Sequence, residues 1–544
     1  MHYPQYFAVA AILMSSFPAF AVPFQTAGPL AGTNADPNSY DDKPQLATDG
    51  NGHWVAVWES AETVSFGTPD DENIAVSRSS DNGATWTTPE WLNSTAEDDE
   101  NFISEATPTL ATDGNGTWIC AYLGAIFTPT GHPVIQACIS TDNGATWGDP
   151  IAVNPNHPAS GLIMTPNIAC DGNGNWVLVY VSSEFSETPA TGDADIAVST
   201  STDGTSWTTP VMLNSEGEDD TEQEGNGDAR PVVASDGNGV WVCTWNSTFN
   251  RGIEGQGDRE ISFARSTNNG STWSNQAVLN AEFDTETGLD ENPALASDGN
   301  GNWMITWTGY TNTGGGSRYR IWASASTNDG VAWSTRKQVS SSPADDDEVY
   351  PDVATDGNGK WVIAWQRAIF QGTHDDYDIA MSESTNNGST WSAPENLNSN
   401  ATTDTVDEWY VSIASDGGDH WTAIWRTVDT SNNDLDIWRA ISGEGGGSAF
   451  AIIAPNGGEK WKQGKKQKIK WEPGDAGENV KLELLRNGTV VNTIKNATPN
   501  DGQMKWKVPN SLAPGNGYKV RATSKSNNAI KDSSDGSFKV KTSK

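Results

Sequence analysis

Short apolar runs alternate with polar turns along most of this chain, and the alternation repeats with a period of about 60 residues. In the first unit an apolar run leads into DGNG at Asp49, and alternating large and small apolar residues follow from Trp54 to Trp58. This pattern predicts two strands joined by a tight hairpin turn. A third strand at 74–77 and a short fourth at 91–93 complete the unit. Four antiparallel strands per repeat are typical of a β-propeller blade.

The hairpin tryptophan recurs in every unit, and a second turn pattern recurs between the third and fourth strands. The residues matching Trp54 are Trp118, Trp176, Trp241, Trp303, Trp361 and Trp421. The second pattern reads SSDNGATW from Ser79, and later copies include STDGTSW and STNNGSTW. Its acid or amide can bond turn amides, and its glycine can take a positive φ. We therefore predict a structural role for Asp81, Asp142, Asp203, Asn268, Asn328 and Asn386.

The two patterns differ in number, with seven copies of the first and six of the second. The seventh unit ends near Ile441 without a turn pattern or a fourth strand, whereas residues 24–32 precede the first unit. If those residues supply the missing outer strand, both chain ends are hydrogen-bonded in one blade and two sheet edges disappear. The count therefore favours seven blades, with six as the alternative.

The pattern S-x-D-x-G-x-T-W resembles the Asp box of the BNR-repeat, sialidase-like propellers, and the resemblance extends over roughly residues 24–442. It implies an all-β fold, a seven-bladed or alternatively six-bladed sialidase-like propeller. Asp boxes in that family lie opposite the active site and occur in enzymes and binding proteins alike. The resemblance thus indicates the fold and leaves the activity open.

Tryptophan is abundant, with 25 copies, and 18 of them fall at repeat positions where burial in the core is expected. In the propeller only Trp409, in the loop before the seventh unit, stands out as a possible platform for a ligand.

The first 21 residues predict a secretory signal peptide, because an apolar stretch ends in Ala19-Phe20-Ala21. Later segments lack a run of 18 apolar residues, so a secreted or periplasmic protein without a transmembrane segment is expected. In an oxidising compartment Cys120 and Cys138 could form a disulfide, and a pair of buried thiols is the alternative.

Charge divides the chain into two parts. Residues 450–544 hold 18 Lys and Arg against 8 Asp and Glu, a balance of +10. Since the whole chain has 32 against 71, residues 1–449 hold 14 against 63, or −49. The Gly-rich stretch 443–449 reads as a linker. We therefore expect a propeller at 22–442 and a basic β-sandwich at 450–544.

The basic region carries Pro455-Asn456-Gly457-Gly458-Glu459, then Trp461 and the run Ile469 to Trp471. This pattern is similar to the Ig-like modules of the Kre9/Knh1 type. Such a basic module could contact an anionic polymer or surface, or the acidic propeller itself.

Acidic residues of the propeller gather between consecutive units and after second strands, on one expected face. A solvated surface is one interpretation, recognition of a cationic ligand another, and calcium binding a third. The best local cluster for calcium is Asp375, Asp376 and Asp378. Nucleic-acid binding is not expected of so acidic a propeller.

The sialidase resemblance implies three arginines that hold a sugar carboxylate and a tyrosine nucleophile activated by glutamate. In that family the first arginine stands two residues before a proline, and here none of the corresponding residues is arginine. The weaker candidates are Arg230, Arg367 and Arg426, with Tyr350 and Tyr410 in comparable loops. The six histidines form no metal-ligand spacing.

These observations favour a secreted propeller that binds an extracellular glycan or protein without catalysis. An exo-sialidase or other glycoside hydrolase is the first alternative, and a structural or adhesive surface protein is the second.

Overall fold

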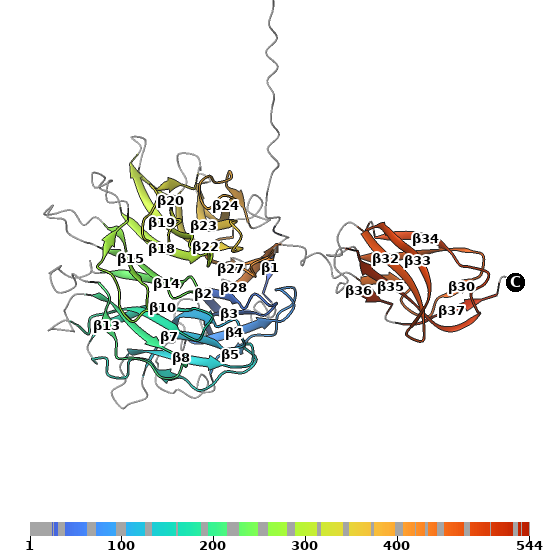
Figure 1. Ribbon diagram of the computed structural model, residues 1–544, viewed down its shortest axis with the longest axis horizontal. Coiled ribbons are helices and arrows are strands. Elements are labelled where there is room, and N and C mark those ends of the chain that lie inside the picture. The colour runs from blue at the N-terminus through green and yellow to red at the C-terminus, as the bar shows by residue number, and fades with distance from the viewer. Residues whose placement is uncertain are drawn as a thin grey trace, which may run out of the picture.

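The computed structural model describes the following parts of the chain: residues 24, 27–30, 39–62, 72–93, 105–125, 133–158, 161–185, 194–214, 228–247, 259–279, 289–312, 317–340, 347–370, 375–397, 406–418, 420–429, 434–442, 451–472, 479–500, 502–525, 531–534 and 536–542. The predicted signal peptide, the Gly-rich linker and the acidic runs at 97–100 and 216–220 lie outside these residues. Every regular element within them is a β-strand (Figure 1).

The propeller strands follow the predicted order within each unit. First strands are β2 (Ser39–Thr48), β6 (Ala106–Thr112), β10 (Ile163–Cys170), β14 (Ala229–Ser235), β18 (Asp290–Ser297), β22 (Asp347–Thr355) and β26 (Glu408–Ser415). Second strands are β3 (Trp54–Glu62), β7 (Trp118–Ala125), β11 (Trp176–Ser182), β15 (Trp241–Ser247), β19 (Trp303–Asn312), β23 (Trp361–Phe370) and β27 (Trp421–Asp429).

Third and fourth strands complete the units. Third strands are β4 (Asn73–Ser79), β8 (Pro133–Ser140), β12 (Asp195–Ser201), β16 (Glu260–Ser266), β20 (Ser317–Ser326), β24 (Asp375–Ser384) and β28 (Asp434–Ser442). Fourth strands are β5 (Glu90–Trp91), β9 (Ile151–Ala152), β13 (Val211–Met212), β17 (Ala277–Val278), β21 (Lys337–Gln338) and β25 (Glu395–Asn396).

Within the described residues these strands form five four-stranded sheets, β6–β9, β10–β13, β14–β17, β18–β21 and β22–β25, and one eight-stranded sheet. The larger sheet runs β26-β27-β28-β2-β3-β4-β5, and β1 (Gly28–Pro29) lies on β28. Its two halves meet at one parallel pair, Tyr40 with Leu435. The first strands contact one another in a closed cycle, from β2 through β6, β10, β14, β18, β22 and β26 back to β2. The all-β propeller expected from the repeats is therefore present.

The N-terminal strand β1 pairs with β28, the third strand of the seventh unit, where the repeat pattern predicts no fourth strand. Gly28 lies opposite Arg439, and the backbone amide of Leu30 donates to the carbonyl of Ile437 at 2.7 Å. Phe24 and Ala27 pack on the core cluster formed by the sixth and seventh units. The prediction that residues 24–32 supply the outer strand of the seventh unit is confirmed for this pairing.

Neighbouring first strands are latched by polar side chains that point across the junctions. Thr109, Asn167, Asp352 and Ser412 each accept a hydrogen bond from a backbone amide of the next first strand, at 3.2, 2.9, 2.8 and 3.2 Å. The last of these joins Ser412 to Leu46 across 366 positions. Side chains at this position therefore help to hold the ring closed.

The tryptophans of the second strands are core residues, as predicted. Those at the Trp54 and Trp58 positions expose 2% of their surface or less. Each buried indole removes on the order of 200 Å² from water, so these rings dominate packing between units. The six turn tryptophans are less enclosed, since only Trp86 counts as buried and the other five are half-buried.

The turn between third and fourth strands is closed by its own side chains. Asp81 accepts bonds from the Ser79 hydroxyl and from both the amide and the hydroxyl of Thr85, at 2.8, 2.8 and 2.6 Å. The Trp86 indole donates to the carbonyl of Gly83 at 3.0 Å. Gly83 has a φ of 77° and lies against Thr422 of the seventh unit. The turn therefore packs its own unit onto a neighbouring one.

Two sheets form the C-terminal region. The smaller contains β29 (Ala451–Ala454), β31 (Lys466–Glu472) and β34 (Gln503–Lys507). The larger runs β30 (Lys460–Lys462), β37 (Phe538–Lys541), β35 (Gly515–Ser524), β32 (Asn479–Arg486) and β33 (Thr489–Pro499), with β36 (Lys531–Ser533) on β35. Trp471 of the smaller sheet and Leu482 of the larger belong to one buried cluster, so the sheets pack face to face as an Ig-like sandwich.

The cysteines are free thiols. Cys120 and Cys138 lie directly opposite each other on β7 and β8, yet they form no disulfide, and both are buried. Burial raises the pKa of the Cys138 thiol to about 12, despite a contact with the Tyr122 hydroxyl that acts in the opposite direction. Of the two interpretations of this pair, buried thiols match the structure. In the described part of the chain no helix is long and apolar enough to cross a membrane.

Candidate functional site

Each first strand carries a β-bulge near its start, and one residue of each bulge has a left-handed backbone. The bulge residues are Lys43, Thr107, Thr165, Arg230, Asn292, Tyr350 and Tyr410, with φ between 47° and 55°. The strand register shifts at each of them, for example between Val349 and Asp352. Non-glycine residues rarely adopt this conformation, so seven equivalent instances mark a shared structural device.

Proline explains why the bulge is tolerated. In six units a proline directly follows the bulge residue, and the seventh has Val411 there. Proline has no amide to donate, so the break in the ladder leaves fewer donors unsatisfied. It also disfavours the right-handed helical conformation in the residue before it.

The bulges lie on one rim of the ring. First strands all begin at the same side of their units, and the DGNG turns follow their opposite ends. The seven bulge side chains therefore surround the start of the innermost strands. Although their backbones match, the side chains range from cationic to hydroxyl, amide and aromatic.

Aromatic rings and two arginines gather along one arc of this rim, from the fourth to the seventh unit. The guanidinium of Arg230 lies 5.6 Å from the centre of the Tyr350 ring, and Tyr350 lies 5.4 Å from Tyr410. Tyr410 adjoins Trp409 at 6.2 Å, and Trp409 packs on Tyr377 at 4.8 Å. These five residues are termed the aromatic arc below.

Arg426 lies beside the arc rather than open to a ligand. Its guanidinium lies 5.0 Å from the Trp409 ring and 5.3 Å from the Tyr410 ring. It also donates to Asp42 at 2.9 Å, and the same carboxylate accepts the Tyr40 hydroxyl at 3.3 Å. Its charge is therefore already balanced within the protein.

Lys43 and Glu59 form the neighbouring pair, with two contacts of 3.0 and 3.1 Å. Burial raises the pKa of Glu59 even though Lys43 and the amide of Thr107 act in the opposite direction. Burial lowers the pKa of Lys43, but Glu59, with smaller contributions from Asp42 and Tyr410, raises it above its ordinary value overall. This pair links the first unit to the second through the Thr107 amide, at 2.6 Å.

The three candidate arginines are thus placed differently. Arg230 is exposed, and among the described residues no carboxylate forms an ion pair with it. Arg426 is paired with Asp42. Arg367 lies 3.5 Å from the buried carboxylate of Glu348 and 3.3 Å from Asn396. The expected carboxylate pocket therefore has one arginine open to a ligand and two held by acids of the protein.

Tyr410 of the arc is protonated near neutral pH, because its pKa is raised. Burial raises the pKa of Tyr410, the charges of Asp42 and Tyr350 add to the rise, and Arg426 and Lys43 oppose it. Burial likewise raises the pKa of Tyr319, whose neighbours include Glu291 and Tyr350. A phenol with a raised pKa stays protonated, so it can donate a hydrogen bond but supplies little phenolate for nucleophilic attack.

The cluster proposed from sequence for calcium lies in β24. Asp376 and Asp378 are buried, at 2% and 0% exposure, and the side chain of Asp375 lies outside the described set. Among the described side chains, no group of three or more His, Cys, Asp or Glu is placed to hold a metal ion. Calcium binding here stays a prediction.

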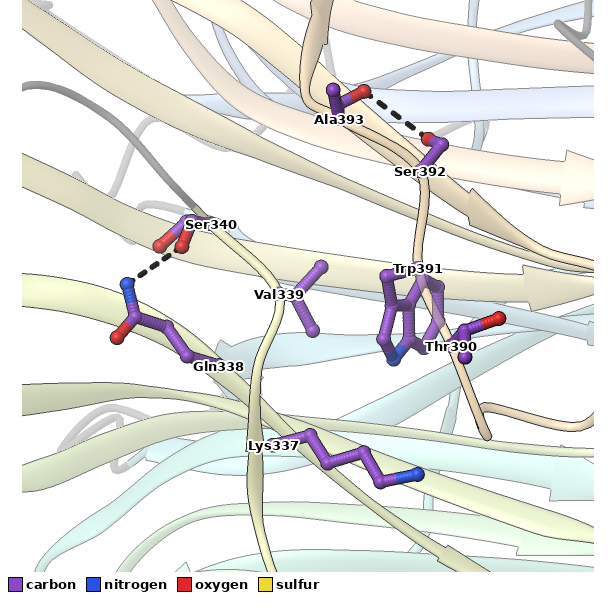
Figure 2. A pocket seen from close by; sticks show the side chains of 8 residues that line it. All are labelled: Lys337, Gln338, Val339, Ser340, Thr390, Trp391, Ser392 and Ala393. Atoms are coloured by element: carbon purple, nitrogen blue, oxygen red, sulfur yellow. Dashed lines mark hydrogen bonds between the residues drawn. The ribbon is translucent and has the colours of Figure 1, made fainter. Parts of the chain in front are cut away.

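A shallow pocket also opens at the outer edge, between the fifth and sixth units (Figure 2). Several of its polar groups bond locally: the Gln338 amide donates to the carbonyl of Ser340, and the Ser392 hydroxyl donates to that of Ala393. Lys337 donates to the carbonyls of Gly388 and Ser389, and Trp391 belongs to a repeated turn. The aromatic arc is therefore a better candidate for a ligand-binding site than this pocket.

Two family models match the chain. Residues 183–445 match the BNR repeat-like domain, and residues 454–540 match the Kre9/KNH-like N-terminal Ig-like domain. The chain thus combines a region similar to the BNR repeat-like domain with a region similar to the Kre9/KNH-like Ig-like domain. All five arc residues lie within the span that matches the BNR repeat-like domain. No curated protein is similar to the chain in sequence.

Solved structures that are similar to the chain include two sialidases and an arabinofuranosidase. The Hadza microbial sialidase Hz136 shares 17% identity, with a TM-score of 0.41, over 60% of this chain and 63% of that one. The NanB sialidase from Streptococcus pneumoniae shares 15%, with a TM-score of 0.39, over 77% and 70%. The alpha-L-arabinofuranosidase Arb93A from Fusarium graminearum shares 17%, with a TM-score of 0.42, over 66% and 97%. This chain thus spans less than two thirds of Hz136, and similarity this low decides no activity for the BNR-repeat propeller.

The sequence analysis identified Arg230, Tyr350, Tyr410 and Trp409 but not the repeated β-bulges that place them on one rim. It compared residues two positions before each proline, whereas the bulge residue stands one position before it. Tyr377 was missed because it lies within the third strand of the sixth unit, and only folding brings it to Trp409. The residue directly before each repeated proline was the available signal.

Proposed function

We propose that the BNR-repeat propeller binds an extracellular glycan at the aromatic arc, without catalysis. The observation that carries this proposal is the contiguous surface of Arg230, Tyr350, Tyr410 and Trp409, drawn from three units. Aromatic rings stack against the apolar faces of sugars, and phenol and guanidinium groups bond sugar hydroxyls or carboxylates. The apolar stretch of residues 1–21 supports an extracellular setting.

Binding without turnover is favoured by the state of the candidate catalytic groups. A tyrosine nucleophile needs a lowered pKa or an adjacent base. The pKa of Tyr410 is raised instead, and its cationic neighbour Arg426 is held by Asp42. A pocket for a sugar carboxylate would also need more than the single open guanidinium of Arg230.

The experiment is a binding and hydrolysis screen of the full mature chain on sialosides, arabinosides and neutral hexosides. Tyr350→Ala should weaken binding at least about tenfold, because a central aromatic contact is lost. Tyr350→Phe should retain most of the affinity. Lys337→Ala, at the outer pocket, is the matched control and should leave binding unchanged.

Arg230→Ala separates the ligand classes. A loss confined to sialosides would indicate that the guanidinium reads a carboxylate, and a loss for all sugars would indicate a hydroxyl contact. Turnover of any glycoside would replace this proposal with a glycoside hydrolase. Binding that persists in both Tyr350→Ala and Arg230→Ala would move the site away from the arc.

A further inference from the structure

The smaller sheet of the Ig-like module has an outer face made largely of lysine. Along β31 the buried Ile469 and Trp471 alternate with the exposed Lys466, Lys468 and Lys470. Along β34 the buried Trp506 alternates with the exposed Lys505 and Lys507. Because successive side chains point to opposite faces of a strand, all five lysines project from one face.

The strand register places these lysines opposite one another. Lys466 lies opposite Lys507, and Lys468 lies opposite Lys505. Residues directly opposite in an antiparallel pair have Cβ atoms about 5 Å apart, and residues two apart along a strand lie about 7 Å apart. The ammonium groups therefore form a regular grid, termed the lysine face below.

Like charges directly opposite one another destabilise a sheet. Among the described side chains none of the five lysines forms an ion pair, although Lys481 and Arg521 on the larger sheet both pair with Glu483, at 2.6 and 2.7 Å. The module thus pairs part of the charge on the larger sheet, whereas these five lysines of the smaller sheet have no ion pair among the described side chains. Because these like charges destabilise the folded module, their presence indicates a role in binding another molecule.

The composition of the lysine face selects the kind of partner. Protein interfaces bury aromatic and apolar side chains at their centre and are depleted in lysine. Here the exposed large apolar residue on this sheet is Ile453, at its edge, with 46% of its surface exposed. Proteins that bind single-stranded nucleic acid present aromatic rings for base stacking, whereas Trp471 and Trp506 are buried beneath the face.

We infer that the lysine face binds a linear anionic polysaccharide. A flat grid of hydrated ammonium groups suits an extended chain whose carboxylates repeat at each sugar and stay largely solvated. Binding would release counterions condensed on the polymer, so it would weaken as salt increases. This site is separate from the aromatic arc and does not depend on the function proposed for the propeller.

The test measures binding of the full mature chain to polygalacturonate, with its neutral methyl ester as the ligand control. Lys468→Glu with Lys505→Glu should weaken binding at least about tenfold at low salt, since two attractive charges become repulsive. Lys495→Glu with Lys531→Glu changes the net charge equally on strands of the larger sheet, where both lysines are exposed. That control should change affinity less than about twofold.

Equal weakening by both charge-reversed pairs would overturn the inference, because net charge alone would then explain binding. Equal binding of the methyl ester, or tighter binding of duplex DNA than of polygalacturonate at matched charge concentration, would overturn it as well. Lys468→Gln with Lys505→Gln guards against misfolding. It should weaken binding while amide exchange in β31 and β34 stays unchanged or slows, because like-charge opposition is relieved. Loss of binding accompanied by faster exchange would count against the inference.

Discussion

At both ends of the innermost strands the backbone conformation repeats from unit to unit. The side chains repeat at one end and differ at the other. At the end where DGNG turns follow the first strands, side chains repeat with the backbone: Asn173 and Asn300 each bond the next unit's turn, at 2.9 and 3.0 Å. At the bulge end the left-handed conformation repeats in all seven units, yet the seven bulge side chains fall into five residue types and only threonine and tyrosine recur.

Within each repeat, residues at the DGNG end are constrained by stability, whereas side chains at the bulge end are available for function. Where the same contact is needed between every pair of units, the same residue is kept, as at the turn glycines. Where the fold needs only a kinked backbone, the side chain is free to differ, and the differing side chains converge on one rim. Three of the five arc residues, Arg230, Tyr350 and Tyr410, therefore occupy positions where the fold fixes the backbone but not the side chain.

The largest effect is expected at the repeated end, from Gly270→Ala. This glycine has a φ of 73°, and a Cβ there would lie 2.6 Å from Val177 in the preceding unit. Strain and the clash together should lower the free energy of unfolding by about 2–4 kcal/mol. Thermal and urea denaturation would measure the loss.

Gly114→Ala is the matched control, because its φ is 72° but its Cβ would be no closer than 3.8 Å to the carbonyl of Asp49. It should cost about 1 kcal/mol from the backbone alone. Equal losses in the two variants would show that packing between units contributes nothing at this turn.

A pH-dependent effect is expected from Asp352, two residues after the bulge residue Tyr350. Burial raises the pKa of Asp352 to about 6, although the amides of Ile413 and Val353 that bond it act in the opposite direction. Because this folded-state value exceeds the unfolded one, the stabilisation is complete below the unfolded pKa and is lost as the pH rises through about 6.

The wild type should therefore lose up to about 3 kcal/mol relative to Asp352→Asn between pH 4 and pH 7. Denaturation of both proteins across this range gives the difference. Thr109→Ala removes the equivalent contact between the second and third units, away from Asp352, and should run parallel to the wild type. Parallel curves for Asp352→Asn as well would refute the assignment.

A smaller loss is expected in the repeated turn from Asp81→Ala, which removes three hydrogen bonds to Ser79 and Thr85. The expected decrease in the free energy of unfolding is about 1–2 kcal/mol. Asp81→Asn should cost less, because Asn268 accepts equivalent bonds from Ser266 and Thr272 in the fourth unit. Equal losses in Asp81→Asn and Asp81→Ala would mean that the carboxylate charge, not the bonds, matters.

The sequence predicts the features that repeat along the chain. It does not predict the contacts between residues that only the fold brings together. The strands, the hairpins, the buried tryptophans and the pairing of Gly28–Pro29 all follow from local pattern and copy number. The bulges shift the register by one residue, and composition alone does not reveal which residue turns left-handed. The contact of Tyr377 with Trp409 and the opposition of Lys468 and Lys505 depend on strand pairing, so they required coordinates.

The smallest effect is expected from relieving the strain of the left-handed backbone at a bulge residue. Thr165 is β-branched, has a φ of 47°, and its hydroxyl is buried without a hydrogen-bond partner among the described residues. Thr165→Gly should raise the free energy of unfolding by about 1 kcal/mol, because glycine adopts this conformation without strain. Asn292→Gly, at a φ of 55°, should gain less, since asparagine tolerates the left-handed region. If Thr165→Gly destabilises the protein instead, the side chain contributes packing there, and the bulge end would resemble the repeated end more closely than its sequence variety indicates.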